Sequence, residues 1–148
     1  PILYSCHPRS RNRLATSGFE LDSRVIQHEP LGFHDYNCLQ MNAFAVVSDS
    51  GTLPEESSFF TSIGYPFPAI CIRTSTERPE AIDKGGFIIA GIDERSLLQA
   101  VDTAVELCRN AQYGIPVPDY VDENVSTKVV KIVQSYVSIV NKMVWRKF

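Results

Sequence analysis

The sequence lacks the cysteine pattern of a disulfide scaffold or a cysteine-ligated metal site. Its four cysteines, Cys6, Cys38, Cys71 and Cys108, are widely separated, and no two of them form a CxxC pair. Cys71 lies in a run typical of a buried strand and Cys108 in one typical of a helix, so we expect free thiols. This usage favours a reducing, cytoplasmic location over a secreted one.

A large excess of charge of one sign is also missing. Fourteen Lys and Arg residues face 17 Asp and Glu residues, for a net charge of -3. This balance disfavours a nucleic-acid or anionic-membrane partner. No apolar run is long enough to span a bilayer. The three histidines, His7, His28 and His34, lack ligand spacing, so we predict no metal site.

The first residues of the sequence are unusual for the start of a protein. Residue 1 is proline rather than methionine, and the strand-like "ILYSCH" follows at once. We therefore expect this chain to be a piece of a longer protein.

What the sequence does have is a regular alternation of strand-like and helix-like segments. Continuous apolar runs predict strands at 2–6, 25–27, 43–47, 69–72 and 87–90, and helices are expected at 9–16, 35–41, 54–62, 79–84 and 94–111. Continuous rather than alternating apolar strands are typical of a sheet covered on both faces. The prediction is an α/β fold: a Rossmann-like parallel sheet with helices on both faces, over residues 1–112.

The tail has a different character. Residues 113–125 carry two prolines and several acids, and they predict an extended linker. Ser126 is expected to cap a long helix over 126–148. Its apolar surface is wider than one small domain needs. A core helix would account for it, but we favour a helix that packs towards a missing neighbouring domain.

Polar residues gather where the third predicted strand ends, in "SDSGT" (48–52). The amides and dipole of a following helix attract phosphate, Ser50 can add a hydroxyl, and Gly51 permits close approach. A simple serine-rich helix cap is the alternative. Glu55 and Glu56 lie one turn further in; one of them could accept hydrogen bonds from the vicinal hydroxyls of a ribose, or both could merely complement the dipole.

Three other loops offer candidates. Arg73 and Arg78 flank the loop after the fourth predicted strand, where a guanidinium suits a diphosphate, unless Arg78 pairs with a neighbouring surface glutamate. His7, at the end of the first strand, could transfer protons or contact phosphate, or be an ordinary loop residue. Tyr36 could stack on a base, or pack within its helix.

Taken together, the motifs "HPRSR", "EPLGFHDYN", "SDSGTLPEES" and "RTSTERPEA" resemble the C-terminal half of the non-hydrolysing UDP-N-acetylglucosamine 2-epimerases, in matching order and spacing. The resemblance covers essentially the whole chain. It implies the C-terminal half of a GT-B-type two-domain fold, without its first strand and helix and without the N-terminal domain.

The resemblance also implies roles at individual positions. Ser50, Gly51 and Thr52 would hold the diphosphate of UDP. Glu56 would bind the ribose, and Arg78 would lie near the pyrophosphate or order its loop. Three further positions would complete the site: Tyr36 beside the uracil, the backbone around Leu31 at the base edge, and His7 close to the reacting sugar.

The implied reaction inverts C2 of a UDP-2-acetamido sugar by elimination and re-addition of UDP, without a cofactor. The C2 acids and bases would come mainly from the missing N-terminal domain, so the 148 residues alone are expected to bind UDP weakly and to catalyse nothing. The full-length protein is expected to be a homodimer.

Departures from the family pattern point to a branch of it. Thr52 stands where the family commonly has a second glycine, and 59–69 is slightly longer than usual. The phrases "FHDYN", "SDSGT" and "SYVSIVNKMVW" look like a capsule and O-antigen branch that makes UDP-N-acetyl-L-fucosamine from its talose epimer. A GT-B glycosyltransferase, a hydrolysing epimerase and a non-catalytic domain are the alternatives.

Overall fold

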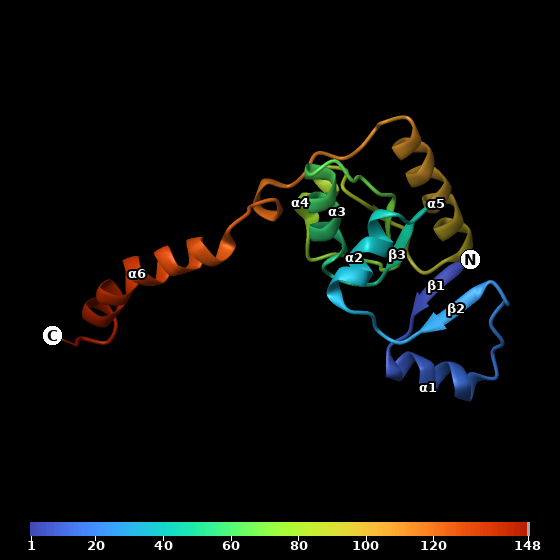
Figure 1. Ribbon diagram of the computed structural model, residues 1–148, viewed down its shortest axis with the longest axis horizontal. Coiled ribbons are helices and arrows are strands. Elements are labelled where there is room, and N and C mark those ends of the chain that lie inside the picture. Colours follow the sequence, from blue (N-terminus) through green and yellow to red (C-terminus); the bar gives the residue numbers. More distant parts are fainter. Residues whose placement is uncertain (148) are drawn as a thin grey trace. The chain divides into compact units, whose positions relative to one another are not determined.

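The computed structural model describes residues 1–147 and contains two compact units, Pro1–Phe44 and Ala45–Phe148 (Figure 1). The first unit is a pair of strand–helix repeats, β1 (Ile2–Ser5), α1 (Pro8–Ser17), β2 (Val25–His28) and α2 (Phe33–Met41). The two strands are parallel, with Ile2 opposite Val25. Parallel neighbours need a crossover between them, and α1 supplies it.

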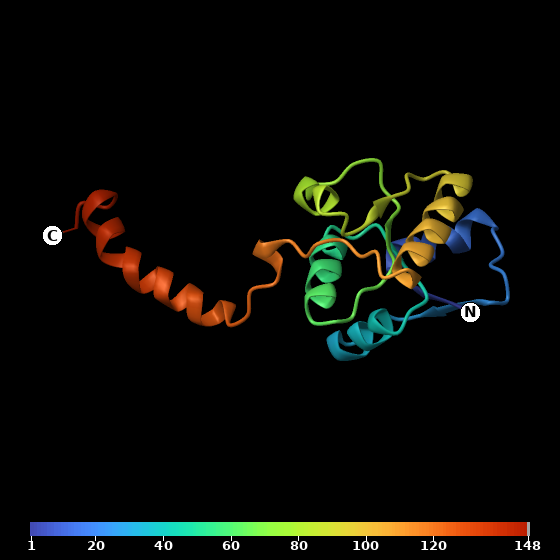
Figure 2. The ribbon, with the colours of Figure 1, turned by 90° about the horizontal axis from the view of Figure 1, so that it is seen from above.

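The second unit contains a three-stranded parallel sheet in the order β3–β4–β5. Its elements are β3 (Val46–Ser48), α3 (Leu53–Ser62), β4 (Ala69–Cys71), α4 (Pro79–Asp83), β5 (Ile88–Ile89), α5 (Glu94–Arg109), the 3-10 turn η1 (Pro118–Tyr120) and α6 (Val125–Met143). Helices α3 and α5 both contact β4 and lie on opposite sides of this sheet (Figures 1 and 2). The predicted α/β architecture with parallel strands is confirmed.

The core of the second unit sits where α5 packs on the sheet. Ile70 of β4 is fully buried, and it clusters with Ala90 and with Ala100 and Ala104 of α5. Alanines on the contact face let the helix axis approach the strands closely. Burial of this face accounts for the helical spacing of apolar residues in 94–109.

Differences from the sequence-based expectations occur at two places. The five strands form two sheets, β1–β2 and β3–β4–β5, rather than one continuous sheet among the described residues. The expected cap of α6 at Ser126 is wrong. The N-cap is Asn124, in the left-handed region at φ 57° and with no capping hydrogen bond from its side chain. Asparagine tolerates this conformation better than most residues, which explains why the helix begins there.

A segment that we call the strap, residues 114–121, follows α5 and lies against α3 and α4. The amide of Ile115 donates to the carbonyl of Lys84 (2.8 Å), and Val117 is 3% exposed. The amide of Val117 reaches Ser58 Oγ at 3.4 Å. Part of the region predicted as a linker is therefore docked on the second unit.

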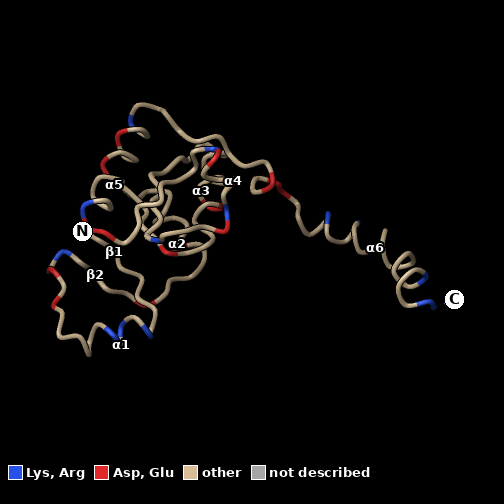
Figure 3. The backbone as a smooth tube through the Cα atoms, turned by 180° about the vertical axis from the view of Figure 1, so that it is seen from behind, with Lys and Arg blue, Asp and Glu red and all other residues tan. Residues whose placement is uncertain are grey.

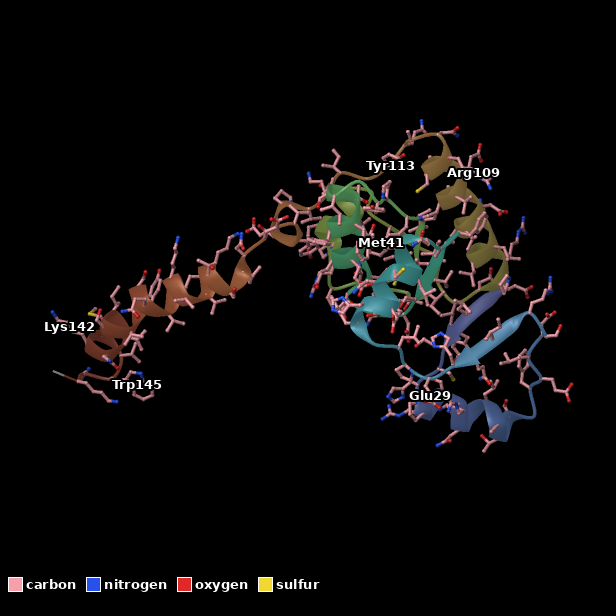
Figure 4. All side chains as sticks on the ribbon, in the orientation of Figure 1. Glu29, Met41, Arg109, Tyr113, Lys142 and Trp145 are labelled. Atoms are coloured by element: carbon pink, nitrogen blue, oxygen red, sulfur yellow. The ribbon has the colours of Figure 1, made fainter. Side chains whose placement is uncertain are left out.

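Helix α6 has no buried residue along Val125–Met143. Figure 4 shows side chains along α6, with Lys142 and Trp145 near its end. Large exposed apolar side chains include Val130, Ile132 and Tyr136. Over residues 1–147, no helix is both long enough and apolar enough to cross a membrane.

Candidate functional site

The loop that leaves β3 is held by its own hydroxyl groups. The amide of Ser50 donates to Ser48 Oγ (3.0 Å), and the amide of Thr52 donates to Ser50 Oγ (3.3 Å). The hydroxyls of Ser50 and Thr52 lie 2.8 Å apart. These short polar side chains therefore build a compact turn at the carboxyl end of β3, the edge at which parallel sheets bind ligands.

Helix α3 begins at the end of this loop without a side-chain cap. Its N-cap, Thr52, has helical dihedral angles (φ -86°, ψ -12°), and its side chain makes no capping hydrogen bond. Instead, Thr52 Oγ1 donates to Glu56 Oε1 (2.9 Å). Thr52 therefore does not act as the simple helix cap that was the alternative interpretation of this loop. The helix end therefore carries its partial positive charge without a capping side chain, and Glu55 and Glu56 lie in its first turn.

Arg78 is held at the same helix end by Glu55. Arg78 Nε and Nη2 lie 2.8 and 2.7 Å from Glu55 Oε1, and both side chains are 37% exposed. This bond is the largest cause of the raised pKa of Arg78. The sequence alternative, in which Arg78 pairs with Glu77 or Glu80, is wrong: the partner lies 23 residues earlier in the chain. Only the packing of α3 beside α4 brings the two residues together.

Arg73 forms a separate ion pair beside Gly51. Its two terminal nitrogens lie 2.7 and 3.1 Å from the carboxylate oxygens of Glu77, which gives a bidentate contact. The bond from Arg73 lowers the pKa of Glu77. A Cβ built on Gly51 would stand 3.9 Å from both Arg73 Nη1 and Glu77 Oε1. Both residues lie in the loop between β4 and α4, where the helical rule for residues four apart does not apply, so no signal in the sequence identifies this pair.

Both basic and acidic positions lie beside α3 and α4 (Figure 3). The structure thus brings together Ser50, Gly51, Thr52, Glu56 and Arg78, the predicted residues that belong to the second unit. Around them it adds two carboxylates, Glu55 and Glu77, that hold the arginines.

The remaining predicted residues belong to the first unit. His7 is the N-cap of α1, and its Nδ1 accepts a hydrogen bond from the amide of Arg9 (3.2 Å). Leu31 is 38% exposed and lies just before α2. Tyr36, in the first turn of α2, accepts a hydrogen bond on its hydroxyl from Gln40 Nε2 (3.2 Å). His7 and Tyr36 thus have local structural roles, and the roles of all three residues towards a ligand stay predictions.

Comparisons with known proteins agree with these motifs. A family profile described as UDP-N-acetylglucosamine 2-epimerase matches residues 1–134. The structure of UDP-N-acetylglucosamine 2-epimerase from Rickettsia bellii is 39% identical, with a TM-score of 0.84, over 99% of this chain and 39% of that one. The Methanocaldococcus jannaschii enzyme in complex with UDP-GlcNAc and UDP is 27% identical, with a TM-score of 0.75, over 90% of this chain and 35% of that one.

Curated relatives give the same result. UDP-N-acetylglucosamine 2-epimerase of Methanocaldococcus jannaschii is 30% identical over 113 residues, which are 74% of this chain and 30% of that protein. The Bacillus subtilis enzyme of the same name is 34% identical over 99 residues, which are 66% of this chain and 25% of that protein. The chain thus spans less than a third of these relatives' length. The chain belongs to the UDP-N-acetylglucosamine 2-epimerase family.

Proposed function

We propose that this chain is the UDP-binding C-terminal part of an enzyme that inverts C2 of a UDP-2-acetamido sugar. The observation that carries the proposal is the start of α3. An uncapped helix end and two hydroxyls 2.8 Å apart follow β3, and the guanidinium of Arg78, which follows the neighbouring strand β4, is bonded to Glu55 in the first turn of that helix. This set of donors suits a diphosphate. The Methanocaldococcus jannaschii relative, whose structure is a complex with UDP-GlcNAc and UDP, supports the choice of ligand.

In this proposal, the diphosphate contacts Ser50, Gly51 and Thr52. Glu56 accepts hydrogen bonds from the ribose hydroxyls, because an ionised carboxylate can accept several hydrogen bonds besides the one that its Oε1 receives from the Thr52 hydroxyl. His7, Leu31 and Tyr36 would contribute from the first unit, near the sugar, the base edge and the uracil. The acids and bases at C2 come mainly from an N-terminal domain, towards which α6 packs, and the full-length protein is a cytoplasmic homodimer.

The chemistry is an elimination followed by an addition. A base takes the C2 proton while the C1–O bond breaks, so that the electron pair of the C–H bond forms the C1–C2 double bond and UDP departs with the bonding electrons. Re-addition of UDP at C1, with protonation of C2 from the opposite face, inverts that carbon. The amides at the start of α3 and Arg78 stabilise the negative charge that grows on the leaving diphosphate, which is the usual role of preorganised donors.

The substrate is proposed to belong to capsule or O-antigen biosynthesis. UDP-GlcNAc is the first candidate, and the branch that acts on UDP-2-acetamido-2,6-dideoxy-L-talose is the second, on the strength of "FHDYN", "SDSGT" and "SYVSIVNKMVW". A Pseudomonas aeruginosa relative, 26% identical over 71% of this chain, is named UDP-2,3-diacetamido-2,3-dideoxy-D-glucuronate 2-epimerase. The sugar named in that relative differs from UDP-GlcNAc, which supports testing more than one sugar nucleotide as the substrate.

The decisive test uses the full-length protein in D₂O with each candidate sugar nucleotide. Proton NMR should show deuterium entering at C2 together with the C2 epimer, because re-protonation draws on solvent. Release of free N-acetylmannosamine would instead indicate a hydrolysing enzyme, and turnover that requires an acceptor sugar a glycosyltransferase. UDP binding without any exchange would indicate a non-catalytic domain.

The position of the diphosphate is tested separately. Titration with UDP and with UMP should shift the amide signals of Ser50, Gly51 and Thr52 in the full-length protein, and UDP should shift them more. Arg78→Lys should weaken UDP binding, because lysine cannot make the bidentate contacts of a guanidinium. Arg95→Lys, at an exposed position of α5, is the matched control. Equal effects of UDP and UMP would contradict the proposed cradle.

A further inference from the structure

Near its end, the strap contacts the first turn of α4, the helix that begins just after Arg78. Its 3-10 turn, Pro118–Tyr120, contacts α3. The Tyr120 hydroxyl donates a hydrogen bond to Glu80 Oε1. Glu80 lies in the first turn of α4, and Arg78 is the N-cap of the same helix. This hydrogen bond connects the strap to the first turn of the helix whose N-cap is Arg78.

The proton of this bond belongs to the phenol. Burial and then the bond to Glu80 raise the pKa of Tyr120 to about 12. The same bond is the largest cause of the lowered pKa of Glu80. At neutral pH the tyrosine is therefore a neutral donor and Glu80 a charged acceptor, the stronger type of hydrogen bond.

Glu80 is a second carboxylate that acts on the guanidinium of Arg78. Three side chains raise the pKa of Arg78: Glu55 has the largest effect, and Tyr120 and Glu80 have smaller ones. In the structure Arg78 bonds to Glu55, on the tip of α3, while Glu80 bonds to Tyr120. Glu55 accepts from Arg78 and Glu80 accepts from Tyr120, so the guanidinium of Arg78 stays at the N-terminus of α3.

We propose that Tyr120 is a positioning residue for Arg78: by occupying the carboxylate of Glu80, it leaves Arg78 bonded to Glu55 at the N-terminus of α3. Without the hydroxyl, Glu80 turns to Arg78 and draws the guanidinium away from that end. The position of the strap, the segment that precedes α6, thereby affects diphosphate binding. This inference rests on the proposed function, because it takes Arg78 to be a diphosphate contact.

The test measures UDP affinity and kinetics in the full-length protein. Tyr120→Phe should weaken UDP binding about twofold to fivefold, the range within which exposed ion pairs act. Glu80→Gln alone should leave the affinity unchanged, because no carboxylate then competes. The double variant Tyr120→Phe/Glu80→Gln should regain wild-type affinity. Tyr113→Phe, an exposed tyrosine just before the strap, is the matched control.

The rescue separates positioning from mere structural support. A purely structural hydrogen bond predicts that Glu80→Gln weakens UDP binding as Tyr120→Phe does, and that the double variant is no better; that result would overturn the inference. If Tyr120→Phe does not fold, a double variant that folds and binds UDP normally supports it, and one that does not fold refutes it. Unchanged UDP affinity in Tyr120→Phe, with weaker binding in Arg78→Lys, would refute this inference but keep the proposed function. Unchanged affinity in Arg78→Lys would refute this inference together with the proposed contact between Arg78 and the diphosphate, while the exchange experiment in D₂O still tests the proposed reaction.

Discussion

The docking of the strap depends on a glycine at which no side chain fits. A Cβ built on Gly114 would lie 2.3 Å from the carbonyl oxygen of Gly85, and 2.5 and 2.7 Å from the next two backbone atoms, in Gly85 and Gly86. Each contact is with backbone, which cannot rotate away as a flexible side chain does. Gly114→Ala must therefore push the strap off α4.

The cost can be worked out from what is lost. Forcing an extra carbon into a packed site costs about 1–3 kcal/mol, and the hydrogen bond from Ile115 to Lys84 (2.8 Å) contributes about 0.5–1.5 kcal/mol net. The strap should therefore open more easily by about 2–4 kcal/mol. Since about 1.4 kcal/mol corresponds to a factor of ten, its opening equilibrium should rise roughly 30-fold to 1,000-fold.

Hydrogen exchange followed by mass spectrometry in the full-length protein measures this opening directly. Peptides that cover 114–121 should exchange faster by that factor, while peptides from α5 keep their rates. Gly32→Ala is the matched control, because its Cβ would meet only Asp35 Oδ2, at an ordinary 3.7 Å, and its φ of -64° suits alanine. Strap protection within twofold of wild type in Gly114→Ala would refute the close approach and with it the docked strap.

Three more predictions test other parts of the molecule. Glu56→Gln in the full-length protein should weaken UDP binding by about 1–3 kcal/mol in calorimetry, the usual cost of a lost charged hydrogen bond, whereas unchanged affinity would restrict Glu56 to its contact within α3. Asp93 caps α5 by accepting from the amide of Ser96 (2.9 Å), which lowers its pKa; its stabilising effect is therefore present above the unfolded pKa and lost as the pH falls through the folded one. Asp93→Ala should accordingly raise exchange in the first turn of α5 at pH 7 but add little near pH 2. Iodoacetamide should modify exposed Cys38 well before Cys71, whose thiol is buried with a raised pKa; equal rates would contradict the buried position of β4.

Much of the fold follows from local patterns in the sequence. Prolines at 8, 54 and 79 stand in the first turn of α1, α3 and α4, where a missing amide proton costs nothing. The continuous apolar run of 69–71 is the strand buried on both faces. The helical spacing in α5 determined which side faces the sheet. Such features depend on residues a few positions apart, so the chain order alone reveals them.

The candidate site was predictable in its residue types and in its place at a strand end. Motif order pointed to Ser50, Gly51, Thr52, Glu56 and Arg78, and the structure places all of them in the second unit. What they would do for a ligand comes from the family resemblance and is still to be tested.

Pairing between distant residues was decided only by the tertiary structure. Arg78 has acidic neighbours on both sides in the sequence, yet it bonds to Glu55, because α3 packs beside α4. Tyr120 lies in a stretch whose prolines and acids predict an open linker, yet it reaches Glu80, 40 residues earlier. Composition describes what a segment tends to do alone. Which carboxylate an arginine or a tyrosine meets depends on how separate helices pack, and that information is spread over the whole core.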